Sequence, residues 1–199
     1  MARSASFSRT TKETSIEATV NLDGTGSADV QTPLPFLTHM VEQLARHGLV
    51  DLVVRASGDT EIDGHHTTED LGLVLGQCIA KALGDKTGIS RYGWATLPMD
   101  EARATCALDL SGRAHFVWEV PLPRGAKLGT WDIELAPVFF EAFARGAQCN
   151  LHVVLERGEI LHHIVEVSFK ALARALREAV KVDPRAAGVV PSTKGSLDD

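Results

Sequence analysis

The chain has 199 residues, of which 44% are hydrophobic and 23% are charged, as in ordinary soluble globular proteins. Its formal net charge of −6 argues against non-specific nucleic-acid binding, because such binding needs a basic surface. No run approaches the roughly 18 apolar residues of a membrane span, and the polar N-terminus lacks the apolar segment of a secretory signal. The three cysteines lack C-x-x-C spacing, which favours reduced thiols in a cytoplasm.

The first half of the chain predicts three strands, a helix, a further strand and a second helix. Asp23-Gly24-Thr25-Gly26 is typical of a hairpin turn, so the third strand is expected to return alongside the second. Pro35 favours a helix start, and Gly48 and Gly84 favour helix ends. The expected elements are strands at 6–11, 16–22 and 28–31, a helix at 35–47, a strand at 49–56 and a helix at 65–83.

The second half predicts the same order of elements. Two histidine pairs, each ahead of a helix, stand 97 positions apart, which is close to half the chain and indicates an internal duplication. We expect an α+β fold in which each half, residues 1–92 and residues 93–199, lays two helices on one face of a small sheet. The expected elements are strands at 94–99, 104–110 and 115–120, a helix at 131–145, a strand at 149–155 and a helix from 162.

The strongest chemical signal is the motif HHxxE, which occurs twice, as His65-His66-x-x-Glu69 and as His162-His163-x-x-Glu166. On a helix each histidine shares a face with the glutamate three or four residues on. Adjacent histidines point about 100° apart, so one ion does not easily bind both. Imidazole nitrogen with carboxylate oxygen suits zinc, manganese or iron. The sequence therefore predicts a paired metal site, whose two halves meet across a pseudo-two-fold axis or across a subunit boundary.

Other candidate residues lie outside these motifs. His39 is on the non-apolar side of its helix and is a further possible imidazole ligand, whereas His47 precedes the helix end, where the dipole favours a cation. Ser111-Gly112-Arg113 and Ser192-Thr193-Lys194-Gly195 combine hydroxyl groups with cations, as groups that hold phosphate oxygens do.

Several collinear motifs resemble those of the imidazoleglycerol-phosphate dehydratase family, over almost the whole chain. The stretches that carry this resemblance are Arg9-x-Thr11-x-Glu13-Thr14, Leu34-Pro35-Phe36-Leu37-Thr38-His39-Met40, Asp63-Gly64-His65-His66-Thr67-Thr68-Glu69-Asp70, Gly88-Ile89-x-Arg91-Tyr92-Gly93, Pro98-Met99-Asp100-Glu101, Asp109-Leu110-Ser111-Gly112-Arg113, Leu151-His152, His162-His163-x-x-Glu166-x-x-Phe169-Lys170-Ala171 and Pro191-Ser192-Thr193-Lys194-Gly195.

The resemblance implies two tandem halves of the ribosomal-protein-S5-domain-2-like fold, two manganese ions per active site, and a homo-oligomer of 24 subunits with sites between subunits. It implies substrate-side roles for Glu13 and His47. For the proton transfers we expect Glu13, Glu69 or Glu166 to act, with His39 also at the catalytic centre. It implies metal ligands at His39, His65, His66, Glu69, His162, His163 and Glu166. It implies phosphate contacts at Arg91, Arg113, Lys170, Ser192 and Lys194.

The reaction that the resemblance implies removes water from D-erythro-imidazole glycerol phosphate, giving imidazole acetol phosphate in L-histidine biosynthesis. Metals on the ring nitrogens would favour the imidazolate, which can expel the neighbouring hydroxyl. One departure from the family pattern stands at Val138, which is the second half's counterpart of His39 and cannot bind a metal. Two alternatives remain open from the residues: a dinuclear metal hydrolase and a non-catalytic metal-binding shell protein.

Overall fold

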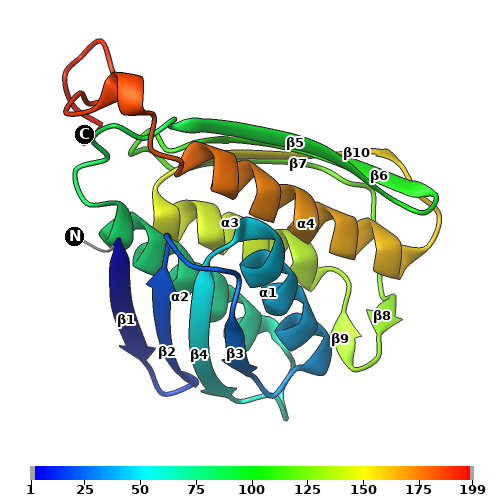
Figure 1. The fold of residues 1–199 in the computed structure, drawn as a ribbon. Helices are drawn as coiled ribbons and strands as arrows, with labels where there is room; N and C mark the ends of the chain where they lie inside the picture. Colours follow the sequence, from blue (N-terminus) through cyan, green and yellow to red (C-terminus); the bar gives the residue numbers. More distant parts are fainter. Residues whose placement is uncertain (1–2, 198–199) are drawn as a thin grey trace.

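The computed structural model describes residues 3–197, in which two four-stranded sheets enclose four α-helices (Figure 1). The first half has the order of elements that the sequence predicted. It contains β1 (Ser4–Thr10), β2 (Thr14–Asn21), β3 (Ala28–Gln31), α1 (Pro35–Gly48), β4 (Asp51–Gly58) and α2 (His65–Leu83).

The second half repeats this order and adds a small two-stranded sheet before its first helix. It contains β5 (Tyr92–Met99), β6 (Ala102–Asp109), β7 (His115–Glu119), β8 (Lys127–Leu128), β9 (Trp131–Asp132), α3 (Leu135–Ala147), β10 (Asn150–Arg157) and α4 (Leu161–Ala179), followed by a 3₁₀ turn at Pro184–Ala186. The prediction of a helix from Trp131 was wrong at its start, because Trp131 pairs with Leu128 in the small sheet.

Strand order is the same in both large sheets, β1-β2-β4-β3 and β5-β6-β10-β7, as a tandem repeat requires. The predicted hairpin at 23–26 was wrong, because β4 lies between β2 and β3, and β3 pairs with β4 in parallel. One carboxylate holds the loop in this path. The Oδ1 atom of Asp51, the first residue of β4, accepts hydrogen bonds from the N–H groups of Thr25, Gly26 and Ser27, and so holds this loop at the start of β4.

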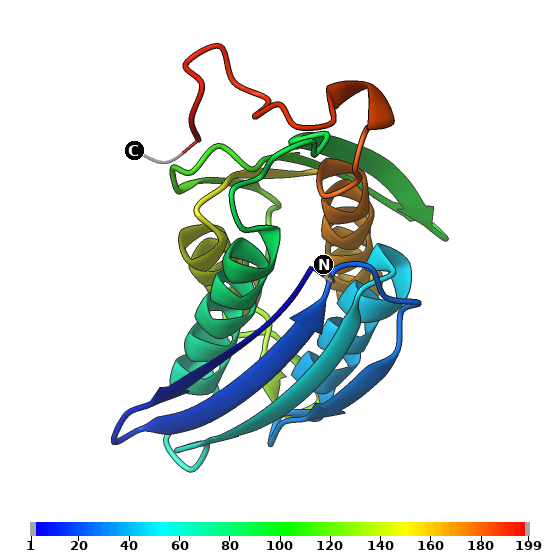
Figure 2. The same ribbon diagram turned by 60° about the vertical axis from the view of Figure 1, so that its left-hand side comes forward.

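The helices form the middle layers of the molecule, so the expected placement of two helices on one face of each sheet is confirmed (Figure 2). The first helix of each half packs on the second helix of the other half, α1 on α4 and α2 on α3. Both halves therefore share one hydrophobic core, which includes Phe139, Phe143 and Phe169. No helix in residues 3–197 is long and apolar enough to cross a membrane.

Candidate metal centre

The contact between α1 and α4 brings together His39, His162 and Glu166. The Nε2 atoms of His39 and His162 lie 3.4 Å and 2.9 Å from Oε2 of Glu166. One possible ligand atom from each residue lies within 4.8 Å of the others. His162 and Glu166 share a face of α4 because they stand four residues apart. Two imidazoles and one carboxylate at this spacing fit a borderline divalent ion such as zinc, manganese or iron.

Glu166 is a carboxylate in this arrangement. Burial of its side chain, which is 8% exposed, opposes ionisation, but hydrogen bonds from Lys170 and His162 outweigh burial and leave the pKa of Glu166 below its ordinary value. The Nζ atom of Lys170 lies 2.7 Å from Oε1 of Glu166. Lys170, expected as a phosphate contact, therefore lies one helical turn from the metal group and beside one of its ligands.

A hydrogen-bonded row runs along α1 from this group. The Nε2 atom of Gln43 lies 3.5 Å from Nδ1 of His39, and its Oε1 atom lies 3.1 Å from Nε2 of His47. Burial, followed by the positive charges of Lys170 and Arg174, lowers the pKa of His47. His47 is therefore a neutral imidazole at pH 7, joined to His39 through Gln43.

A pocket of about 470 Å³ opens beside the metal group. Its walls include the rings of Phe36, His39 and His162 and the loop at residues 128–130 between β8 and β9. The Phe36 ring packs edge-on against His162 at 5.3 Å and also contacts the buried Trp131 at 5.2 Å. Trp131 in turn donates a hydrogen bond to Thr68 at the start of α2. This apolar layer separates the two HHxxE motifs within one chain.

The first HHxxE motif lies at the start of α2, away from the group formed by the second. Nδ1 of His66 lies 3.0 Å from Oδ2 of Asp59, and this hydrogen bond raises the pKa of His66. Glu13 is farther away, at 3.9 Å from the same nitrogen. Glu13 and Asp59 line a second pocket of about 380 Å³. His65 is exposed next to His66, with ring centroids 6.1 Å apart.

The internal repeat predicts a second three-residue group of Val138, His65 and Glu69, in which Val138 stands where His39 stands in the first. Val138 packs against the hydrophobic core instead. Glu69 is paired with Arg145 of α3, whose Nη2 lies 2.6 Å from Oε1. Among residues 3–197, only the group of His39, His162 and Glu166 has metal-binding geometry, so the two halves differ in this respect.

His163 points away from its neighbour His162, as adjacent helical positions require. Its Nδ1 lies 2.7 Å from Oε2 of Glu101 in the turn between β5 and β6. The other oxygen of Glu101 accepts hydrogen bonds from the N–H groups of Glu159 and Ile160. The hydrogen bond from His163, aided by the Ile160 N–H, lowers the pKa of Glu101 to about 2, and the same pair raises the pKa of His163.

Most of the expected phosphate contacts lie at the other end of α4. Arg91 pairs with Asp109 and donates a hydrogen bond to the carbonyl of Pro191, next to Ser192 and Lys194. The N–H of Arg91 bonds to Ala179, which lies roughly 20 Å along the helix from Glu166 at 1.5 Å per residue. Arg113 lies at the same end of the second sheet, where its carbonyl accepts a hydrogen bond from Asn150.

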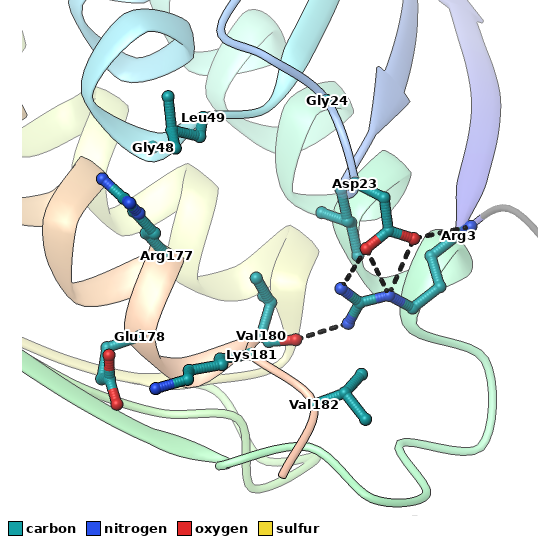
Figure 3. A pocket seen from close by; sticks show the side chains of 11 residues that line it. Arg3, Asp23, Gly24, Gly48, Leu49, Arg177, Glu178, Val180, Lys181 and Val182 are labelled. Atoms are coloured by element: carbon teal, nitrogen blue, oxygen red, sulfur yellow. Dashed lines mark hydrogen bonds and ion pairs between the residues drawn. The ribbon is translucent and has the colours of Figure 1, made fainter. Parts of the chain in front are cut away.

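A further pocket, of about 530 Å³, lies between the start of β1 and the ends of α1 and α4 (Figure 3). Its prominent cation, Arg3, points to the carboxylate of Asp23 and to the carbonyl of Val180 within the same chain. Its lining contains none of the candidate residues. This pocket is therefore not the candidate site.

Sequence reasoning missed several residues that contact the candidate ligands, among them Asp59, Glu101 and Arg145. Glu101 belongs to one of the quoted motifs, Pro98-Met99-Asp100-Glu101, but nothing in its spacing indicated His163 as its partner. One general signal applies, since a metal-binding histidine usually donates a hydrogen bond from its other ring N–H to a carboxylate, a backbone carbonyl or water.

Comparison with known proteins gives consistent matches. The model of the imidazoleglycerol-phosphate dehydratase family matches residues 32–176. Curated relatives described as imidazoleglycerol-phosphate dehydratase include one from Granulibacter bethesdensis, 55% identical over 99% of this chain and all of that protein, and one from Jannaschia sp., 54% identical over 98% of this chain and all of that protein.

Two crystal structures under the same description are also similar to the chain. The one from Staphylococcus aureus has a TM-score of 0.81 and 34% identity, and the match covers 90% of this chain and 99% of that one. The one from Pyrococcus furiosus has a TM-score of 0.79 and 32% identity, and covers 96% of this chain and 99% of that one.

Proposed function

Because the chain belongs to the imidazoleglycerol-phosphate dehydratase family, and is thus a hydro-lyase of histidine biosynthesis, we propose that it dehydrates D-erythro-imidazole glycerol phosphate to imidazole acetol phosphate with two manganese ions per active site. The observation that carries the metal dependence is the group of His39, His162 and Glu166. The three cysteines are buried unpaired thiols, which supports a cytoplasmic location.

The donor atoms fit manganese in type and spacing. His39, His162 and Glu166 would hold one ion, and the remaining ligands would come from His65, His66, Glu69 and His163. Ligation by Glu69 requires that its carboxylate be shared with, or released from, Arg145. Bound metal would act as a Lewis acid that lowers the pKa of a coordinated azole ring.

The protein's own groups would handle the protons of the reaction. Glu13 is half-exposed at the rim of its pocket and lies outside hydrogen-bond distance of His66, so it is available to exchange a proton with a bound substrate. Glu69 and Glu166 are the other carboxylates proposed for proton transfer, and His39 contacts Glu166 directly. Neutral His47 can accept or donate a hydrogen bond on the substrate side.

The phosphate group of the substrate would be held by Arg91, Arg113, Lys170, Ser192 and Lys194. The guanidinium of Arg91 is fixed by Asp109 and by the Pro191 carbonyl, which keeps the 192–194 segment beside it. These contacts orient the substrate and contribute binding in the ground state. We expect Arg113→Ala to raise KM more than it lowers kcat, as steady-state kinetics would measure; a loss confined to kcat would contradict this role.

Metal affinity tests the proposed ligands. We expect His162→Ala to weaken manganese binding by at least about 100-fold, because it removes a direct ligand, and loss of a residue that merely hydrogen-bonds to a ligand costs about 10- to 100-fold. Calorimetric titration of metal-free protein measures this. His152→Ala is the matched control, since His152 is an exposed histidine on β10 that contacts His115. Equal affinities for the two variants would refute the ligand assignment.

Inhibition by 1,2,4-triazole separates the proposed reaction from hydrolysis. The azole has adjacent and opposed ring nitrogens that can occupy metals in place of the substrate ring. We expect it to compete with imidazole glycerol phosphate. A dinuclear hydrolase, which activates water, would be largely unaffected, and a metal-storage shell would bind manganese without turning over the substrate.

A further inference from the structure

The second histidine of each HHxxE motif makes the same kind of contact. Nδ1 of His66 faces Asp59 at 3.0 Å, and Nδ1 of His163 faces Glu101 at 2.7 Å. Both carboxylates are largely shielded from solvent, with side chains 15% and 22% exposed. In each case Nδ1 is engaged by a carboxylate of the same chain, so Nε2 is the nitrogen available to another partner. Nε2 of His163 lies 3.8 Å from the exposed carboxylate of Asp100, which is outside hydrogen-bond distance.

The two carboxylates come from different positions of the internal repeat. Glu101 directly precedes β6, and its structural counterpart directly preceding β2 is Glu13. Glu13 nevertheless stays 3.9 Å from His66, whereas Asp59, which directly follows β4, makes the hydrogen bond. At the corresponding place after β10 the chain has Gly158, which has no side chain to offer. Each half thus supplies one carboxylate to its histidine, but from a different strand end: after β4 in the first half and before β6 in the second.

We propose that Asp59 and Glu101 are matched positioning residues that hold His66 and His163 in the Nδ1–H form and direct Nε2 toward the metal. This inference rests on the metal ligation proposed above. A carboxylate on Nδ1 fixes both the tautomer and the ring orientation, and it makes Nε2 a stronger donor. Because Asp59 takes this role in the first half, Glu13 is left facing the pocket, where it can meet the substrate.

The cleaner test is at Asp59, because the Glu101 carboxylate also holds the N–H groups of Glu159 and Ile160. We expect Asp59→Ala to weaken manganese binding by about 10- to 100-fold in calorimetric titration of the metal-free protein. Asp59→Asn keeps an oxygen acceptor without the charge and should restore part of the loss. Glu61→Ala, an exposed acid in the same loop, should bind manganese as the wild type does.

A second readout is the tautomer of His66 in metal-free protein labelled with ¹⁵N-histidine, measured above the pKa of the ring. We expect the Nδ1–H form in the wild type and in Asp59→Asn, and a mixture of tautomers in Asp59→Ala. A purely structural role of Asp59 would lower the melting temperature without this change.

The outcomes distinguish a failure of this proposal from a failure of the metal ligation on which it rests. If His66→Ala binds manganese like the wild type, the ligand assignment fails, and the positioning role with it. If His66→Ala loses affinity while Asp59→Ala keeps it, only the positioning role is overturned. If Asp59→Ala and His66→Ala both lose affinity and the tautomer changes, the proposal stands.

Discussion

Asp51 shows how one side chain determines the path of a whole segment. Its Oδ1 atom accepts hydrogen bonds from three consecutive N–H groups, those of Thr25, Gly26 and Ser27. Asn150, the first residue of β10, makes the matching contact in the second half, where its Nδ2 donates to Ser111 and to the Arg113 carbonyl. In both halves, the strand that lies between two others, β4 or β10, begins with a residue whose side chain holds the loop that connects those two strands.

We expect Asp51→Ala to lower the free energy of unfolding by about 1–3 kcal/mol at pH 7, since several hydrogen bonds to a charged group are lost. The hydrogen bonds from the N–H groups of Ser27 and Thr25 lower the pKa of Asp51 below its ordinary value of 3.8. This stabilisation is therefore present above pH 3.8 and is lost as the pH falls through the lowered pKa. Urea unfolding at pH 7 and pH 3 should show the gap between the variant and the wild type narrowing in acid. A gap that is constant with pH would contradict the role of the charge.

At the scale of the elements, α2 and α3 approach closely because glycines face each other across their contact. A Cβ atom on Gly76 would lie 2.4 Å from the carbonyl oxygen of Phe143 and 2.5 Å from the backbone nitrogen of Ala147. Gly72 and Gly146 are equally close to the backbone of the opposite helix. Backbone atoms cannot turn aside as a flexible side chain can, so the helices must separate to admit a methyl group.

We expect Gly76→Ala to destabilise the protein by about 1–3 kcal/mol through overpacking, although alanine is the better helix former. Gly48→Ala is the matched control, because the nearest atom to a Cβ at this helical position lies at an ordinary 3.5 Å. That variant should melt at or above the wild-type temperature. Thermal unfolding of the two variants side by side measures the difference, and equal losses would contradict the packing argument.

Sequence patterns predicted the elements well and their neighbours less well. Periodicity located four helices and most strands, and the 97-residue spacing of the histidine pairs indicated the repeat, because these signals are local or repeated along the chain. The place of β4 between β2 and β3 involves contacts between distant positions, such as those of Asp51 with a loop 24 to 26 residues earlier. In the same way, HHxxE spacing identified His162 and Glu166, whereas the partners Asp59 and Glu101 come from other elements that no spacing connects to the histidines.

At the scale of the whole molecule, the metal group at His162 and Glu166 and most of the proposed phosphate contacts lie at opposite ends of α4, roughly 20 Å apart by helical rise. A substrate of a few carbon atoms cannot span that distance. The apolar layer of Phe36 and Trp131 also separates the two HHxxE motifs within a chain. Both observations favour the expected homo-oligomer, with each active site built from several copies of the chain.

Mixed assemblies test this arrangement. At a substrate concentration far below the KM of the Arg113→Ala protein, we expect the His162→Ala and Arg113→Ala proteins each to show little activity when separate. We expect activity to return when they are unfolded together and reassembled. If one subunit supplies His162 and another Arg113, random mixing leaves roughly a quarter of the sites with both residues intact. Turnover of imidazole glycerol phosphate before and after mixing measures the recovery. No recovery in assemblies shown to contain both variants would place the whole site within one chain.

The row of His39, Gln43 and His47 along α1 links the metal group to the proposed substrate side. A neutral imidazole that binds a cation through Nε2 carries its proton on Nδ1. In the structure, the amino group of Gln43 faces Nδ1 of His39 and its oxygen faces Nε2 of His47. With an ion on Nε2 of His39, the Gln43 amide would have to turn over, so that its oxygen faces His39 and its amino group faces His47. His47 would then accept a hydrogen bond at Nε2 and carry its proton on Nδ1. Metal binding at His39 would thus determine, through Gln43, whether Nδ1 of His47 donates a hydrogen bond to the substrate or accepts one.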